Sequence, residues 1–121
     1  MANKLVLIEK YDEFLNYIYP KLQQIPRNHG ILKAKVITTV FEQPELFYKA
    51  VKSNQISKLY EADAGLATIR HQLRFLSTAE TIVLKNGKRT KGKFLLDKKA
   101  HQVASIKLAE VGKIIGSMFK K

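Results

Sequence analysis

The stretch QISKLYEADAGLATIRHQLRFLSTA, residues 55–79, decides the fold of this chain. Its apolar residues recur at alternating spacings of three and four positions, and they are Leu59, Ala62, Leu66, Ile69, Leu73 and Leu76. This heptad spacing places one apolar stripe along a long helix, where it packs against partner helices. The pattern predicts a helix over 55–79 inside a helical bundle.

Three further segments have apolar residues at helical spacing, so we predict helices over about 5–24, 30–52, 55–79 and 98–120. The expected buried stripes are Ile8, Tyr11, Leu15, Ile18, Leu22 and Ile25 in the first helix; Ala34, Ile37, Phe41, Tyr48 and Val51, with Val40 and Phe47 beside them, in the second; and Ala104, Leu108, Val111, Ile115 and Met118 in the fourth. Long helices joined mostly by short turns predict an all-α fold, an up-down-up-down four-helix bundle forming a single domain over 1–121.

Two prolines and several capping residues refine these helices. Pro20 and Pro44 lie inside the first and second helices. Because proline lacks an N–H and clashes with the preceding turn, we expect a kink near 16–20, and at Pro44 either a kink or a restart of the helix. Asn28 is the expected N-cap of the second helix and Asp97 that of the fourth, since both side chains accept hydrogen bonds from a first helical turn.

Residues 80–97 break the helical pattern. The segment 85–93 has five positive charges, two glycines and no acidic residue. Asn86-Gly87 is a turn dipeptide, so 82–84 and 94–96 have the composition to pair as a short hairpin. The density of positive charge favours a mobile structure instead, and we predict a basic loop over 80–97.

The charge balance is the strongest compositional signal. Lys and Arg number 22 against 10 Asp and Glu, which gives a net charge of +12. A field this positive attracts polyanions, so nucleic acid, both RNA and DNA, is the favoured partner. An anionic membrane is the competing partner, but no helix sets an exposed apolar face against a lysine face. The chain has no cysteine, no signal-peptide pattern and no membrane-length apolar run, so we expect a cytoplasmic protein.

Catalytic motifs are missing from the sequence. It has no Glu-x-x-His pair, no His-Glu-x-x-His motif, no glycine-rich phosphate loop and no Arg–His spacing of the kind that helical ribonucleases use. Asp63 lies near the apolar stripe of 55–79, where a structural ion pair is a better explanation than catalysis. We therefore predict no enzymatic activity, no cofactor and no metal site, and a hydrolase such as a ribonuclease is the least favoured function.

Clusters of basic residues point to binding instead. The predicted nucleic-acid-binding residues are Arg27, His29, Lys33 and Lys35 at the start of the second helix, Lys85, Lys88, Arg89, Lys91 and Lys93 in the basic loop, and Lys113 and Lys120 on the fourth helix. A helix start also favours anions through its free N–H groups and its dipole. Each cluster alone is typical of solvated surface, but together they favour contacts to a phosphate backbone.

Two other groups of residues suggest contacts with proteins. Arg70 and Arg74, with His71 beside them, lie on one face of the 55–79 helix, where the planar guanidinium suits a protein interface. The alternative for both arginines is ion pairing within the helix or between subunits, for instance with Asp63 or Glu110. On the fourth helix a stripe of small residues, Ser105, Ala109, Gly112 and Gly116, allows close approach of another helix, either within the bundle or from another subunit.

Several stretches resemble a known family. They are YP at 19–20, IPRNHG at 25–30, KSNQISKLYEADAGL at 52–66, LRFL at 73–76 and LAEVGKIIGS at 108–117. Their order and spacing resemble the accessory variability determinant (Avd) proteins of diversity-generating retroelements over nearly the whole chain except 77–99. Parts of the pattern are also similar to the four-helix-bundle proteins encoded in intervening sequences of 23S rRNA genes.

The resemblance implies a non-catalytic, prokaryotic or phage-encoded accessory protein that assembles into a barrel-shaped homopentamer. It implies binding to DNA and RNA and association with the element's reverse transcriptase, in support of mutagenic cDNA synthesis and retrohoming. That enzyme is then the expected partner of Arg70, His71 and Arg74. The alternative is a stand-alone RNA-binding bundle of the intervening-sequence type. The chain departs from the family at Met118-Phe119, where related sequences tend to carry Trp, at Pro44 and at 85–93.

Overall fold

The chain folds into four long helices and a small hairpin in a computed structural model, which describes the backbone of residues 2–120 and the side chains of 6–82 and 86–120. The helices are α1 Ala2–Gln23, α2 Gly30–Ser53, α3 Ile56–Thr78 and α4 Lys98–Phe119. A 3-10 turn, η1 Arg27–His29, precedes α2, and the strands β1 Ile82–Lys85 and β2 Lys88–Lys91 lie between α3 and α4. Each helix begins and ends within three residues of its predicted bounds.

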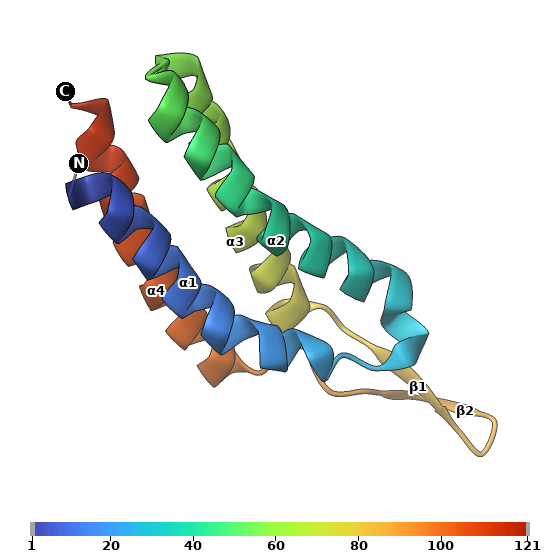
Figure 1. Cartoon of the computed structure of the whole chain (residues 1–121). Helices are drawn as coiled ribbons and strands as arrows, with labels where there is room; N and C mark the ends of the chain where they lie inside the picture. Colours follow the sequence, from blue (N-terminus) through green and yellow to red (C-terminus); the bar gives the residue numbers. More distant parts are fainter. Residues whose placement is uncertain (1, 121) are drawn as a thin grey trace.

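The helices pack in the order of the sequence. α1 packs against α2 and α4, and α3 packs against the same two helices. The chain reverses direction at each connection, so that both termini and the α2–α3 turn lie at one end of the bundle and the hairpin lies at the other (Figure 1). This is the predicted packing of four helices, with a hairpin added to the expected all-α fold.

Most of the predicted stripes form the core. All six heptad residues of α3 are buried, as are Ala104, Leu108, Val111 and Ile115 of α4. On α1 the buried residues are Leu7, Tyr11, Phe14, Ile18 and Leu22, followed by Ile25. Ile8, Leu15 and Met118 pack against this core while remaining half-buried. The α1 stripe is therefore displaced by one residue at two of its positions.

The predicted stripe of α2 is only partly right: Val40 and Phe47 are buried and Ile37 and Val51 pack against the core, but Ala34, Phe41 and Tyr48 are exposed. The residues that α2 buries are Val36, Val40, Gln43, Phe47 and Ala50. Phe41 and Tyr48, which the apolar pattern selected, are each 48% exposed. The buried stripe has regular helical spacing, but one of its members is a glutamine. A reading based on apolar residues alone therefore chose the two aromatic residues on a neighbouring face.

Gln43 is buried because α3 provides its partner. Its Nε2 donates to the backbone carbonyl of Ala62 at 2.7 Å. A Cβ atom on Gly65 would lie only 2.2 Å from Gln43 Oε1, so glycine at this position makes room for the buried amide between the two helices. A buried polar group needs such a hydrogen bond to offset its loss of hydration.

The helix α2 continues without a break through Pro44, so the predicted restart does not occur. Proline has no N–H, and the carbonyl of Val40 therefore lacks its usual helical partner. The hydroxyl of Tyr11 on α1 donates to this carbonyl. Burial, with a smaller contribution from the charge of Asp12, raises the pKa of the Tyr11 hydroxyl, which favours its protonated, donating form.

The helix ends are partly as predicted. Asp97 caps α4, because its side chain accepts from the Ala100 N–H at 2.7 Å. The prediction of Asn28 as the N-cap of α2 is wrong: Asn28 lies inside η1, and His29 occupies the cap position without a side-chain hydrogen bond. The 3-10 turn forms because the His29 N–H bonds back to the Pro26 carbonyl at 3.0 Å.

The predicted loop over 80–97 is also wrong. Residues 82–85 pair antiparallel with 88–91, in a register that sets Ile82 opposite Lys91. Asn86 and Gly87 form the turn with φ values of 52° and 76°, the left-handed conformations that a two-residue hairpin turn requires. The other pairing considered, with 94–96, is not made, because Leu96 is buried in the core.

The Tyr11–Val40 contact gives a test of how α2 tolerates its proline. Tyr11→Phe should lower the free energy of unfolding by about 1–3 kcal/mol, because it leaves a buried carbonyl without a donor. In a Pro44→Ala background the alanine N–H can satisfy the same carbonyl, so the cost of Tyr11→Phe should shrink. Urea unfolding of all four proteins measures both costs. Equal costs in the two backgrounds would contradict this explanation.

Candidate functional site

One end of the bundle gathers most of the predicted basic residues. η1, the start of α2, the hairpin and the start of α4 all lie there (Figure 1). We call this region the basic end, and its exposed cations are Arg27, Lys35, Lys88, Arg89, Lys91, Lys93, Lys98 and Lys99. Sequence reasoning did not include Lys98 and Lys99, which begin α4 and are exposed.

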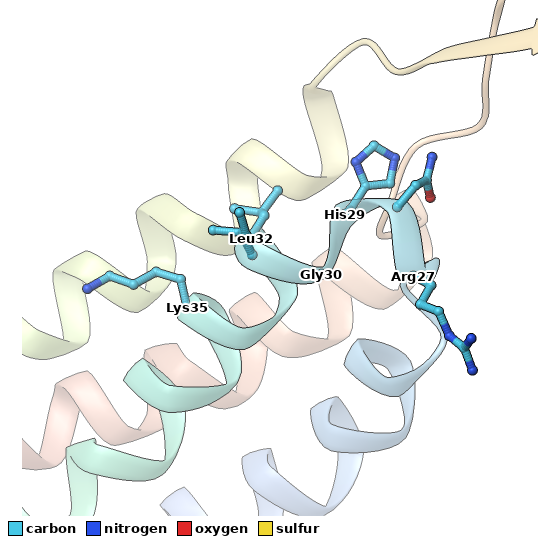
Figure 2. Close-up of a pocket in the computed structure, with 7 residues that line it drawn as sticks. Arg27, His29, Gly30, Leu32 and Lys35 are labelled. Atoms are coloured by element: carbon cyan, nitrogen blue, oxygen red, sulfur yellow. The ribbon is translucent and has the colours of Figure 1, made fainter.

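At the start of α2, a shallow pocket is lined by Arg27, His29 and Lys35 together with Gly30 and Leu32 (Figure 2). The side chains of Arg27 and Lys35 point in opposite directions from the turn (Figure 2). Diverging cations do not enclose a small anion, but they spread positive charge over a broad surface. This arrangement suits an extended polyanion better than a single phosphate group.

Lys33, a predicted nucleic-acid-binding residue, makes hydrogen bonds within the bundle. Its Nζ donates to the backbone carbonyls of Gln23 at 2.9 Å and Ile25 at 3.3 Å. These carbonyls lie where α1 ends, and a lysine there satisfies acceptors that the helix leaves open. Lys33 therefore caps α1 and does not line the pocket beside it.

The remaining predicted cations are not brought together with these. Lys113 and Lys120 are exposed on the second half of α4, toward the end of the bundle that carries the termini (Figure 1). The side chain of Lys85 lies outside the described residues. The structure thus places the turn and hairpin clusters at one end of the bundle and the α4 lysines toward the other (Figure 1).

A second basic site lies between α3 and α4. Arg70, His71 and Arg74 on α3 line a pocket together with Ala67, and α4 contributes His101 and Ser105. No acidic residue is among the lining residues. We call this the α3–α4 pocket. A concave surface that carries two guanidinium groups, two imidazoles and a hydroxyl is suited to an anionic or hydrogen-bond-accepting group.

Arg70 is held in place by α4. Its Nη2 donates to the backbone carbonyl of Leu108 at 3.0 Å. A Cβ atom on Gly112 would lie 2.7 Å from the same nitrogen, so glycine leaves the space that this hydrogen bond needs. One edge of the guanidinium is thereby anchored, while Arg70 as a whole is exposed.

Within one chain, the expected alternative of ion pairing is not observed, and pairing between subunits stays a prediction. Among the described side chains, neither Arg70 nor Arg74 pairs with Asp63 or Glu110. Arg74 Nη2 lies 3.5 Å from His71 Nδ1, at the limit of a hydrogen bond. Glu110 instead pairs with Lys10 at 3.5 Å. The charges of Glu13 first and Glu110 second raise the pKa of Lys10.

The small residues of α4 are not covered by another helix of this chain. Ser105, Ala109 and Gly116 are exposed, and Gly112 is half-buried beneath Arg70. A Cβ on Gly116 would meet no atom within 4 Å. Close packing inside the bundle therefore does not explain the stripe, and only Gly112 has an internal reason to be glycine.

His101 is the pocket residue that sequence reasoning missed. It lies four positions before Ser105, so the two share one face of α4, and both line the α3–α4 pocket. The spacing alone would not have identified the site, because it does not reveal that this face of α4 lies beside Arg70 and Arg74.

Across residues 2–120, no helix combines the length and the apolar character that a membrane span requires. Within the described part of the chain, no group of three or more His, Asp or Glu side chains is arranged to hold a metal ion.

Gly112 provides a test of the anchored arginine. Gly112→Ala should keep or raise the stability of the fold, since alanine favours a helix by about 1 kcal/mol and the arginine tip can move aside. The Arg70–Leu108 hydrogen bond should be lost, which NMR of the guanidinium N–H groups would detect. Gly116→Ala is the matched control, with a similar gain in stability and unchanged Arg70 signals. Unchanged signals in both variants would refute the role given to Gly112.

No curated protein sequence matches the chain. The sequence model of a family described as bAvd-like matches residues 5–121. The match extends through the hairpin and its flanks, which the resemblance of short sequence stretches did not cover. The chain belongs to the bAvd-like family, the accessory variability determinant proteins of diversity-generating retroelements.

Proposed function

We propose that this accessory protein is a non-catalytic subunit that binds nucleic acid and the element's reverse transcriptase at two separate surfaces. In this role it supports mutagenic cDNA synthesis and retrohoming. The observation that carries the proposal is that the described cations form two arrangements of different shape: diverging side chains at the start of α2 and on the hairpin, and a pocket between α3 and α4. One surface is broad and the other is concave, so the two suit different partners.

The basic end supports the binding of nucleic acid. Its exposed lysines and arginines belong to a chain with a net charge of +12. Each phosphate contact releases condensed counterions, so log K should fall by about 0.9 per contact for each tenfold rise in salt on duplex DNA. Sequence-tolerant binding follows from contacts to phosphates, which carry no base identity.

The α3–α4 pocket supports the binding of the reverse transcriptase. Arginine is enriched in protein interfaces because it is weakly hydrated and both stacks and forms paired hydrogen bonds. The bond from Arg70 to the Leu108 carbonyl at 3.0 Å fixes part of the side chain before a partner arrives. A preordered side chain loses less conformational entropy on binding, which favours affinity.

The uncovered stripe on α4 supports self-assembly. Ala109 and Gly116 are exposed and small, so a helix of a neighbouring subunit can approach the α4 backbone closely. Together with membership of the family, this supports a closed homopentamer. In such a ring the basic ends of several subunits would contact one nucleic acid at the same time.

The two-surface proposal predicts that the partners can be separated by mutation. Arg70→Ala with Arg74→Ala should abolish capture of the cognate reverse transcriptase in a pull-down and leave circular dichroism and most DNA binding intact. Arg27→Ala with Arg89→Ala is the reciprocal control, because it also removes two arginines but should weaken only DNA binding. Normal capture by the first variant would remove the pocket from the interface. Absence of capture by the intact protein would favour the stand-alone RNA-binding alternative.

Assembly is tested separately. Light scattering after gel filtration should give about five times the 13.8 kDa mass of the chain. Gly116→Leu should produce smaller species with unchanged helix content, because a bulky side chain blocks the approach of a second helix. Ser117→Leu places the same side chain on an adjacent face and should leave the ring intact. A monomeric intact protein at micromolar concentration would disprove the assembly.

A further inference from the structure

The hairpin is an anchored arm of the bundle. Thr81 is buried, and its hydroxyl donates to the Lys93 carbonyl at 2.8 Å. The Gly92 N–H donates back to the Thr81 carbonyl at 2.8 Å, so the two ends of the hairpin segment are hydrogen-bonded to each other where the hairpin leaves the bundle. Leu96 is buried in the core and its N–H donates to the Leu76 carbonyl at the end of α3, at 3.1 Å. These contacts fix the base of the arm.

The arm itself packs against no helix of the described chain. Every residue of β2 is exposed, and Ile82 on β1 is 60% exposed. The arm projects past the end of the bundle (Figure 1). An isolated two-stranded hairpin is only marginally stable in water, so this one depends on its anchored base. A fixed arm whose described residues pack against no helix is placed to contact another molecule.

Positive charge lies on both faces of the arm. Successive residues of a strand point to opposite faces, so Arg89 and Lys91 project on one side and Lys88 on the other. Lys91 forms one ion pair with Glu80 at 3.7 Å, and both side chains are largely in solvent, where such pairs contribute little. A flat anionic surface would engage one face of the arm. A groove between two phosphate backbones would engage both.

We infer that this hairpin enters the major groove of B-form duplex DNA. The inference rests on the proposed function of the basic end. The B-form major groove is about 12 Å wide and admits a two-stranded β-ribbon. Strands of four residues, at about 3.4 Å per residue, are long enough to reach into a groove about 8.5 Å deep. The major groove of A-form duplex RNA is too narrow for such an arm.

A charge-loss variant tests the arm directly. Lys88→Gln, Arg89→Gln and Lys91→Gln together remove three exposed charges without changing the turn. The matched control is Lys49→Gln, Lys52→Gln and Lys58→Gln, near the α2–α3 turn at the opposite end of the bundle (Figure 1). Binding to a short duplex DNA should weaken by about tenfold or more only in the arm variant. Its salt slope should fall by up to about 2.7, at about 0.9 per lost contact.

Gly87→Val distinguishes the contribution of the arm's shape to DNA binding from the contribution of its charge. Gly87 has a φ of 76°, which strains any side chain, while a Cβ there would meet no atom within 4 Å. The variant should therefore keep every charge and the helical bundle but distort the hairpin turn. The inference expects weaker binding to duplex DNA. Wild-type affinity in this variant would show that charge alone matters and would overturn the inference.

The groove itself is tested with three probes. The intact protein should bind duplex DNA more tightly than duplex RNA or single-stranded DNA of the same sequence. Bulky groups at C5 of the pyrimidines, which fill the major groove, should reduce its affinity to that of the arm variant, whereas a minor-groove ligand should not compete. Equal affinity for duplex RNA, or indifference to the bulky groups, would overturn the groove assignment alone. Failure to bind any nucleic acid would instead disprove the proposed function.

Discussion

The hydroxyl of Tyr11 donates to the Val40 carbonyl, and two similar contacts follow along the bundle. Gln43 on α2 reaches the Ala62 carbonyl of α3, and Arg70 on α3 reaches the Leu108 carbonyl of α4. Each helix is thus tied to the next by a side chain that bonds to backbone. Apolar packing is non-directional and allows a helix to shift along its neighbour. These hydrogen bonds have defined distances and angles, so they fix how far each helix lies along the next. We conclude that they set the alignment of the helices, and with it the geometry of the α3–α4 pocket.

Two glycines and one proline allow these hydrogen bonds between the helices. Gly65 and Gly112 stand where a Cβ would collide with Gln43 and with Arg70, respectively. Pro44 removes the N–H that would otherwise occupy the Val40 carbonyl, and so leaves it open to Tyr11. These residues would weaken an isolated helix. They are tolerated here because each glycine leaves space for a hydrogen bond between helices, and the proline leaves a carbonyl free to accept one.

The positions of the two surfaces suit an adaptor. The basic end carries diverging cations and an arm that extends away from the bundle, and the α3–α4 pocket carries a held arginine on the side of the helices. In the proposed function, the same chain would hold the reverse transcriptase at one site while nucleic acid occupies the other.

The sequence by itself determined the four helices, the full buried stripe of α3, the Asp97 cap and the excess of positive charge, because periodic burial of apolar groups and net charge are local or additive properties. Only the tertiary structure decided that Gln43 is buried, that Lys33 caps α1, that Gly112 accommodates Arg70 and that residues 82–91 form a charged arm. The physical reason is that the position of a polar side chain depends on hydrogen-bond partners that are distant in sequence. The apolar pattern of one segment does not identify those partners.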